Sequence, residues 1–345
     1  MAANRAYDLT ILGAGPAGCA AAIAAARAGL SVALVDRSTF PRPRPGETLH
    51  PGIEPLLDQL GLGTSLRAAE YPRHQGIWVG WAAPFHFQPY GGDSAGPWRG
   101  FQVVRADFDA RLLAAAASDG VDVRLGAADC RFLLERRRVV GLGCGNEELH
   151  GRFTVDAGGG AHALARALGI RVRRYSRPLA ARYGYARGEL PAPYDAPLIA
   201  ADDTGWTWTA RIGPDRFTWA RVDVPSRRRP RQWRPQAVRG LAPMGEARGA
   251  DVTWRLADSV AGAGYFLAGD AGAVLDPASS HGVLRAVMSG MMVAHLAVQH
   301  LRRSAPERAC AAAYRTWFGA CFHRDRLALE LQYQRAGLAV RATGT

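Results

Sequence analysis

The first 36 residues alternate between apolar runs and short glycine-rich breaks. The run YDLTIL at 7–12 ends at Gly13 and predicts a buried strand. The alanine-rich stretch PAGCAAAIAAARAGL predicts a helix that Gly29 closes, and SVALV predicts a second strand that ends at Asp36. Strand, glycine turn, helix, strand and acid follow one another at the spacing of a βαβ unit that binds a dinucleotide.

The remaining pattern predicts an α/β protein with an inserted sheet. A strand end and a helix are predicted over 101–119. Three β runs rich in aromatic residues, LAARYGYARG, GWTWTARI and RFTWARVDV, lie between 178 and 224 and predict an antiparallel sheet. The last part of the chain predicts helices. Short alternating strands are predicted over 121–127, 130–135, 138–144 and 150–156.

Each glycine of the first turn has a predicted task. Gly13 permits the tight turn, Gly15 lets a pyrophosphate approach the helix N-terminus, and Gly18 lets the helix pack closely on the strand. Asp36 is expected to accept hydrogen bonds from ribose hydroxyls. The predicted dinucleotide-binding residues of this unit are Gly13, Gly15, Pro16, Ala17, Gly18, Asp36 and Arg37.

A second stretch of small residues, GDAGAVLDPASSHGVLRA at 269–286, follows a predicted strand near the C-terminus. Its glycines open backbone paths that are closed to other residues and let a ligand lie against the main chain. No second G-x-G-x-x-G follows a strand, so we expect one dinucleotide to be held tightly. A loop that returns from residue 269 indicates a long ligand, with adenine at one end and a larger group at the other.

The net charge limits which kinds of binding partner we expect. The net charge of +13 comes from 43 arginines without a single lysine, and RRR at 136–138 and SRRRPRQWRP at 226–235 are predicted to be exposed. They form either a solvated basic surface or a docking patch for an acidic protein or peptide. Nucleic acid is not an expected partner, because no recognition helix or aromatic RNA-binding motif accompanies the charge.

Location and redox state are also predicted. The N-terminus lacks the pattern of a signal peptide, and polar residues interrupt the apolar segment 283–301, so we expect a cytoplasmic protein that does not span a membrane. The five cysteines show no C-x-x-C pair and no spacing typical of a zinc site. We therefore expect reduced thiols and no metal. The missing pair also excludes the disulfide-exchanging reductases, which share the N-terminal pattern.

These motifs resemble the flavoprotein monooxygenases of the p-hydroxybenzoate hydroxylase type over nearly the whole chain. VVRADFDARLL at 103–113 is similar to the family segment whose arginine, here Arg105, lies along FAD. AGDAGAVLDP at 268–277 resembles the second FAD motif, in which Asp270 bonds the ribityl chain and Pro277 lies near the isoalloxazine. The resemblance thus implies FAD as the cofactor, and the residues expected at this end of it are Arg105, Gly269, Asp270, Pro277 and Gly282.

The resemblance also implies a division of the chain. We expect an α/β fold in which a Rossmann-like FAD-binding domain of the glutathione reductase type carries an inserted antiparallel β-sheet substrate domain and C-terminal helices. The FAD-binding domain takes 1–80, 101–175 and 255–305, the substrate domain takes 81–100 and 176–254, and the C-terminal helices take 306–345.

Within that superfamily, FPRPRPGETLHP and DPASSHGVLRA are similar to the tryptophan halogenases and related tryptophan-modifying enzymes. Halogenases pass hypohalous acid to a lysine, which this chain lacks, and GWTWTAR departs from their W-x-W-x-I-P pattern. GETLHPGIEPLL and ADVTWRLADSVAG are more similar to the flavoproteins that accompany quinone-cofactor amine and amino-acid oxidases. That resemblance implies an FAD-dependent monooxygenase that hydroxylates a tryptophan in a partner, the oxidase precursor, during formation of cysteine tryptophylquinone.

Few side chains are obligatory in such a reaction, because reduced FAD activates O₂. Glu47 and His50 in GETLHP, and His281 in SSHG, are candidates for proton transfer. Glu47 is alternatively a helix cap, and each histidine is alternatively a turn residue. Trp206 and Trp208 share one strand face, so they either line the substrate site or belong to the core.

Several alternatives stay open. The substrate is either a protein side chain or a free small aromatic molecule. The chain is alternatively a non-catalytic flavoprotein, such as a chaperone or an electron carrier, or a saturase similar to geranylgeranyl reductase, which would need a long apolar tunnel. The reductant has no motif of its own, so it is NADH or NADPH bound transiently, or a separate flavin reductase supplies the electrons.

Overall fold

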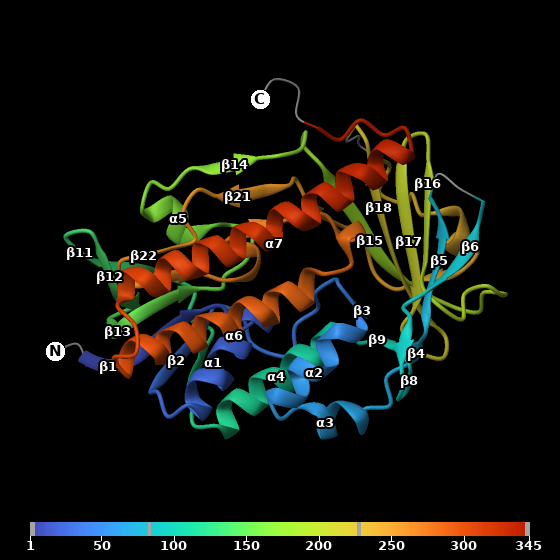
Figure 1. Ribbon diagram of the computed structural model, residues 1–345. Helices are drawn as coiled ribbons and strands as arrows, with labels where there is room; N and C mark the ends of the chain where they lie inside the picture. The colour runs from blue at the N-terminus through green and yellow to red at the C-terminus, as the bar shows by residue number, and fades with distance from the viewer. Residues whose placement is uncertain (1–3, 82–83, 226–228, 342–345) are drawn as a thin grey trace.

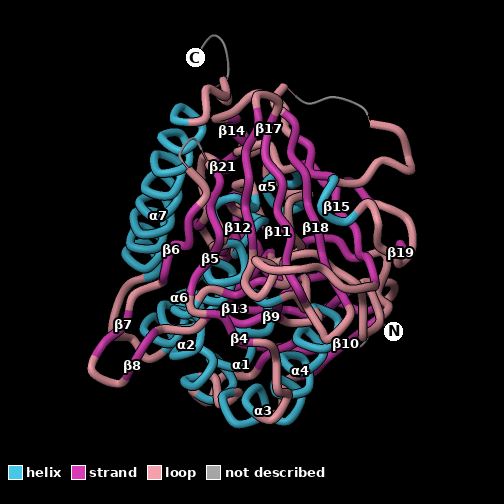
Figure 2. Tube along the Cα trace, turned by 90° about the vertical axis from the view of Figure 1, so that its right-hand side faces the viewer, coloured by secondary structure: helices cyan, strands magenta, loops and turns pink. Residues whose placement is uncertain are grey.

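The structure is a computed structural model that describes residues 4–81, 84–225 and 229–341. Two large sheets form its body, one on the left of Figure 1 and one on the right. Helix α6 (Gly282–Leu301) and the long helix α7 (Glu307–Arg335) cross in front of the first sheet, and α7 continues to the second. Figure 2 is turned by 90° so that the second sheet faces the viewer, with α7 along one margin and helices α1 to α4 below.

The first sheet confirms the βαβ unit. Its centre has the order β10-β2-β1-β13, all parallel, and the apolar runs of β1 and β2 are buried because helices cover both faces. Strands β12 and β11 extend it as an antiparallel hairpin, and β23 pairs with β13. The strands are β1 (Asn4–Leu12), β2 (Val32–Asp36), β10 (Asp122–Leu125), β11 (Cys130–Glu135), β12 (Arg138–Cys144), β13 (Glu147–Asp156), β22 (Ala261–Gly262) and β23 (Tyr265–Leu267).

Small residues let the helices approach this sheet closely. The alanine-rich helix α1 (Pro16–Arg27) is buried along most of its length, and Gly29 closes it with a φ of +83°. A Cβ on Gly290 of α6 would lie 2.2 Å from the Ala17 carbonyl oxygen, so no larger residue fits there. The other helices are α2 (Glu54–Gln59), α3 (Gly63–Arg67), α4 (Arg105–Ser118) and α5 (Ala163–Ala167), and α4 confirms the helix expected within 101–119.

The second sheet is the predicted insertion, and it is wider than the sequence pattern indicated. The three predicted β runs form β15, β18 and β17, in that spatial order. Strand β16 continues the sheet and pairs in parallel with β5, so residues before the predicted boundary at 80 also belong to it. The strands are β5 (Gly76–Gly80), β6 (His86–Pro89), β15 (Ala180–Arg187), β16 (Leu198–Asp202), β17 (Gly205–Arg211), β18 (Arg216–Asp223), β19 (Ala242–Pro243) and β20 (Arg248–Asp251).

Short elements connect the two bodies. Within the described residues, three small sheets and four 3₁₀ turns lie outside the two large sheets. The short strands are β3 (Thr48–Leu49), β4 (Arg73–His74), β7 (Gly92–Asp93), β8 (Gly96–Pro97), β9 (Gly100–Gln102), β14 (Val172–Arg174), β21 (Arg255–Ala257) and β24 (Ala273–Val274), and the turns are η1 (Pro51–Ile53), η2 (Gln236–Val238), η3 (Gly269–Ala271) and η4 (Pro277–Ser279).

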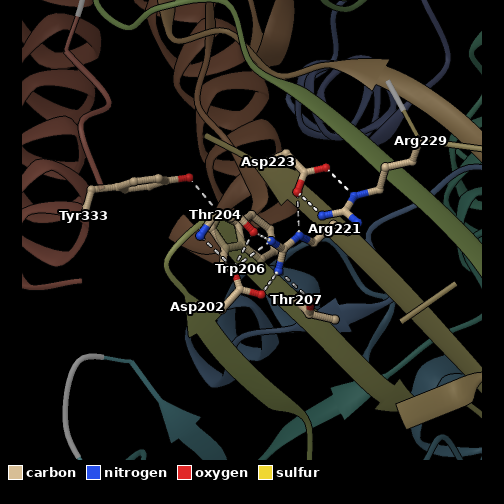
Figure 3. Close-up of polar contacts among 8 residues, drawn as sticks. All are labelled: Asp202, Thr204, Trp206, Thr207, Arg221, Asp223, Arg229 and Tyr333. Atoms are coloured by element: carbon tan, nitrogen blue, oxygen red, sulfur yellow. Dashed lines mark hydrogen bonds and ion pairs between the residues drawn. The ribbon is translucent and has the colours of Figure 1, made fainter. Parts of the chain in front are cut away.

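The expected exposure of the arginine-rich stretch is only partly confirmed. Residues 226–228 of that stretch lie outside the described residues. Arg229 pairs with Asp223, and its guanidinium stacks 4.0 Å from the Trp233 ring centroid, so the stretch folds back onto the second sheet. Asp223 also accepts from Arg221, which is 3% exposed and forms a bidentate pair with Asp202 (Figure 3). These arginines hold the fold together, and Arg231 beside them is exposed.

The expectation of five reduced thiols is wrong for one pair. Cys130 and Cys144 are directly opposite each other on β11 and β12, with Cα atoms 4.3 Å apart, and they form a disulfide. Their separation of 14 residues showed no recognisable spacing because the antiparallel register, and not the sequence interval, brings them together. The other three cysteines are free.

Candidate active site

The two glycine-rich stretches meet at the carboxyl end of β1. Gly13 adopts a φ of +106°, and a Cβ there would lie 2.4 Å from the Ala157 carbonyl oxygen. Gly15 caps α1 and Pro16 occupies its first turn, so the helix N-terminus is open to an anion. Gly269 approaches from the other end of the chain, where a Cβ would lie 3.1 Å from the Ala17 side chain. The backbone therefore requires glycine at positions 13 and 269, whereas a Cβ on Gly15 would meet only Arg42 among the described residues, at 3.6 Å.

The acid at the end of β2 lies where the sequence pattern predicts it. Asp36 is 7% exposed and accepts from the backbone N–H groups of Ala14 and Ser38, each at 2.8 Å. Arg37 is exposed and turned outward, whereas Arg42 lies 3.6 Å from the Asp36 carboxylate and its Nε has no hydrogen-bond partner among the described residues. Arg42 is thus better placed than Arg37 to meet a phosphate. Sequence reasoning missed it because it lies in a proline-rich crossing without a regular pattern.

Arg105 begins α4 and holds a loop. Its guanidinium forms a bidentate pair with Asp109 at 2.9 and 3.1 Å, and Nη1 donates to the Pro45 carbonyl oxygen at 2.7 Å. A Cβ on Gly46 would lie 3.0 Å from Nη1, so glycine is needed for this contact. Arg105 therefore fixes the start of the GETLHP loop.

Asp270 lines a small cavity between α6 and α7. Burial raises the pKa of Asp270, and the nearby Arg285 and Arg105 lower it. The start of α6 at Gly282 opens onto the same cavity, and a Cβ there would meet nothing within 4 Å. The far wall comes from α7, which sequence reasoning did not connect with the site. It consists mainly of apolar side chains, Trp317, Phe318 and Phe322, together with Cys321 and Arg324.

The predicted proton-transfer residues lie on two neighbouring loops. His50 and His281 make an edge-on contact with ring centroids 5.2 Å apart. Burial lowers the pKa of both imidazoles, that of His281 to about 4, so both are neutral near pH 7. His50 Nδ1 accepts from the Gly52 N–H and caps η1, so the cap considered for Glu47 belongs to His50 instead.

Glu47 is buried and hydrogen-bonded across the molecule. It is 5% exposed and accepts from the Gly46 N–H at 2.9 Å and from the Tyr185 hydroxyl of β15 at 2.5 Å. Burial raises the pKa of Glu47, and the Tyr185 bond lowers it. Sequence reasoning missed Tyr185, since nothing in the strand pattern indicates which aromatic residue reaches a loop about 140 residues earlier.

The two tryptophans share a strand face, as predicted, but they differ in position. Trp206 is fully buried beneath α7 and donates from Nε1 to the Tyr333 hydroxyl at 2.6 Å. It therefore belongs to the core and does not line a substrate site. Trp208 is half-buried and lies two residues further along β17. Pro277 is exposed, and Asp276 before it is fully buried.

The glycine turn, Asp36, Arg42, Asp270 and the start of α6 together form a cradle that fits FAD. The glycine turn and Arg42 suit a pyrophosphate, Asp36 suits a ribose, and Asp270 and the open start of α6 lie at the other end, where the resemblance places the ribityl chain and the flavin. Within the described residues, no group of three or more His, Cys, Asp or Glu side chains could hold a metal. One helix, α6, has the length and apolar composition of a membrane span, and in this fold it packs between α1 and α7.

These features define a flavin-dependent enzyme with a Rossmann-like α/β fold, and comparison with known proteins agrees. Residues 8–41 match the family model of FAD dependent oxidoreductases, and residues 98–214 match that of tryptophan halogenases. The chain is 31% identical to a menaquinone reductase of Mycobacterium tuberculosis over 340 residues, covering 86% of this chain and 78% of that one. The chain therefore belongs to this family of FAD-dependent oxidoreductases, which includes both reductases and halogenases.

Halogenases are prominent among the relatives. A tryptophan 2-halogenase of Chondromyces crocatus is 26% identical over 318 residues, covering 83% of this chain and 60% of that one. The structure of the myxobacterial chondrochloren halogenase superposes with a TM-score of 0.85 at 25% identity, covering 99% of this chain and 84% of that one. The predicted fold class is thus confirmed, and FAD is supported as the cofactor.

Proposed function

We propose that this chain is an FAD-dependent monooxygenase that transfers oxygen to an electron-rich aromatic ring. The observation that carries the proposal is the hydrogen bond from Tyr185 to Glu47, because it brings the inner face of the second sheet against the loop that faces the FAD cradle. A substrate between sheet and loop would lie beside the flavin. The balanced reaction consumes O₂, two electrons and two protons, places one oxygen atom on the ring, and releases the other as water.

The strand register supports an aromatic substrate. Tyr183 on β15 pairs with Ala220 on β18, which pairs with Trp208 on β17, so a small residue lies between two half-buried aromatic residues on one face. Thr218 and Ala210 occupy the next row beside Tyr185. A flat ring fits over these small residues and contacts the aromatic side chains on either side.

The loop residues supply proton chemistry. Glu47 holds its proton more tightly than an exposed carboxyl does, and through Tyr185 it can pass that proton toward the sheet. His50 and His281 are neutral, so each can donate from one ring nitrogen and accept at the other. FAD, when bound, supplies the O₂ activation, and these side chains orient the ring and exclude water.

The finer proposal is that the ring is a tryptophan side chain of a partner protein, on the way to a tryptophylquinone. Its support is the similarity of GETLHPGIEPLL and ADVTWRLADSVAG to that group. One relative supports a substrate whose aromatic ring is attached to a protein. It is a 1H-pyrrole-2-carbonyl-[peptidyl-carrier protein] brominase of Pseudoalteromonas luteoviolacea, 27% identical over 328 residues, covering 85% of this chain and 78% of that one. Halogenation by this chain is disfavoured because it contains no lysine.

A second candidate is a reductase of an isoprenoid quinone. The menaquinone reductase of M. tuberculosis favours it, and so does the wall of Trp317, Phe318 and Phe322 along the cavity, which suits an apolar chain. FAD would supply the hydride for reduction of a carbon–carbon double bond, and a side chain of this protein would have to supply the proton. Glu47 and Tyr185 could supply that proton as well.

One experiment separates the candidates. The FAD-loaded protein is reduced with dithionite, so that neither NADH, NADPH nor a flavin reductase is needed, and is mixed in a stopped-flow instrument with O₂ in the presence of free tryptophan or a tryptophan-containing peptide of an oxidase precursor. A product heavier by one oxygen atom supports the monooxygenase. Quantitative H₂O₂ release without product, together with anaerobic flavin oxidation by menaquinone, would overturn it in favour of the reductase.

The location of the protein is part of the proposal. We propose that it acts in the cytoplasm, where the reductants are made. The Cys130–Cys144 disulfide is unusual for that compartment, so the thiol state of protein isolated under alkylating conditions tests this point directly.

A further inference from the structure

A fully buried carboxylate lies beneath the second glycine-rich loop. Asp276 is 0% exposed, and three donors bond its carboxylate. One oxygen accepts from the Ala278 N–H at 2.9 Å and thereby caps η4, the turn that contains Pro277. The other oxygen accepts from the Trp254 Nε1 and from the Tyr333 hydroxyl, each at 2.8 Å. A buried charge is tolerated when it is fully bonded in this way.

The donors come from three distant parts of the chain. Trp254 precedes β21, Tyr333 lies near the end of α7, and the Tyr333 hydroxyl itself accepts from Trp206 of the second sheet at 2.6 Å. Figure 3 shows Tyr333 reaching from α7 toward Trp206. The rings also contact one another, with centroids 5.6 Å apart for Trp254 and Tyr333. The hydrogen bonds thus run from the second sheet through α7 to the loop between Asp270 and α6.

We propose that Asp276 and Tyr333 are positioning residues for the flavin, through which the C-terminal helix sets the conformation of the loop 276–282. Asp276 fixes η4 from below, and η4 leads directly into the start of α6, where Gly282 opens onto the cavity that Asp270 also lines. If the Tyr333 bond is lost, Asp276 keeps its bonds to Trp254 and to the Ala278 N–H, and η4 keeps the bond from Arg285 to Ser279. The inference rests on FAD being bound at this loop and does not depend on the substrate.

Asp276 is sensitive to the loss of a single hydrogen-bond donor because its carboxylate is buried. Burial raises the pKa of Asp276, and the bonds from Tyr333, Trp254 and Ala278 lower it. Removing one donor leaves a buried acceptor short of a partner, and a hydrogen bond to a charged group is stronger than a neutral one. The loop is then expected to shift toward any other donor within reach, which displaces the backbone that faces the flavin.

Tyr333→Phe is the primary test, and Trp219→Phe is the matched control. Trp219 is 1% exposed on the opposite face of the second sheet, and its Nε1 has no hydrogen-bond partner among the described residues. Both substitutions remove a polar atom from a buried aromatic residue, but only the first touches the Asp276 network. FAD affinity is measured by fluorescence titration, and the visible absorption and circular dichroism of bound FAD report its environment.

For Tyr333→Phe we expect the affinity for FAD to fall by about tenfold, equivalent to one lost hydrogen bond to a charged group, with altered flavin circular dichroism. Trp219→Phe should leave both unchanged. Wild-type affinity and an unaltered flavin spectrum in Tyr333→Phe would overturn the inference. If Tyr333→Phe does not fold, Trp254→Phe removes the other donor to the same oxygen and is judged by the same criteria. Failure of the wild-type protein to bind FAD would overturn the proposed function together with the inference.

Discussion

Tyr185→Phe tests whether the second sheet and the GETLHP loop form one site. The Tyr185 hydroxyl donates to Glu47 at 2.5 Å, and Glu47 is 5% exposed. A hydrogen bond to a charged group contributes about 1.5–3 kcal/mol, so the free energy of unfolding should fall by about that amount where Glu47 is ionised. Tyr183→Phe is the control, because Tyr183 lies on the same strand face and its hydroxyl has no hydrogen bond to a described residue.

The contribution of Glu47 to the free energy of unfolding depends on pH, and the direction of its pKa shift gives the sign. Burial raises the pKa of Glu47 above its ordinary value of 4.5, so the folded protein binds this proton more tightly than the unfolded chain does. The resulting stabilisation is complete below pH 4.5 and is lost as the pH rises through the folded-state pKa. Between the two pKa values the free energy of unfolding falls by at most about 1.4 kcal/mol per pH unit. Because the Tyr185 bond favours the ionised form, its removal should deepen the loss on the alkaline side.

Urea unfolding of the wild type and both variants, from about pH 4 to about pH 8, measures this difference. Tyr185→Phe should approach the stability of Tyr183→Phe at the acid end and fall below it at the alkaline end. An equal loss at every pH would refute the reasoning, since the bond would then not depend on the charge of Glu47. No loss at any pH would show that sheet and loop are not joined through this pair.

Three further substitutions test the fold and the cradle. Gly13→Ala should abolish FAD binding, because the new methyl group would lie 2.4 Å from the Ala157 carbonyl oxygen; flavin absorbance retained after gel filtration would contradict this. Cys130→Ser should lower the free energy of unfolding by about 3 kcal/mol, because the disulfide to Cys144 closes a loop with a separation of 14 residues; an unchanged urea midpoint with dithiothreitol would argue against it. Arg221→Met should lower the melting temperature through a loss of up to about 3 kcal/mol, since the buried Asp223 would lose one of its arginine partners; an unchanged melting temperature would mean that the pair contributes little.

Local patterns predicted the nucleotide-binding half of the fold well. The βαβ unit, α4 and the hairpin of β11 and β12 all lie where apolar periodicity and glycine predicted them. Those signals are local, because a parallel strand is apolar throughout and a helix ends at glycine whatever its neighbours are. The strands β5 and β6 were not predicted, because β5 joins the second sheet through a parallel pairing with β16 more than a hundred residues away and β6, among the described strands, pairs only with β5.

The candidate site was predicted less completely, and the reason is physical. Positions that need glycine can be recognised in the sequence, since backbone strain or a close approach excludes other residues. The partner of a buried carboxylate cannot, because any tyrosine or tryptophan on a buried strand has the same pattern as a core residue. Thus Trp206 was considered for the substrate site although it donates to Tyr333 in the core, and Tyr185 was not considered although it reaches Glu47.

The two buried carboxylates differ in what they can do on a scaffold that reductases and halogenases share. Glu47 and Asp276 lie on the two loops that flank the cradle, and each is joined to a tyrosine from another part of the chain. Asp276 is fully hydrogen-bonded inside the core, so it can only fix the conformation of its loop. Glu47 lies where the second sheet meets the GETLHP loop, and both proposed reactions would need a proton there. In the proposed reactions, the side chains that line the substrate site beside Glu47 would decide between oxygen transfer and double-bond reduction. The aromatic row around Ala220 and the apolar wall of α7 are the candidates, so we expect substitutions there to redirect the reaction while FAD stays bound.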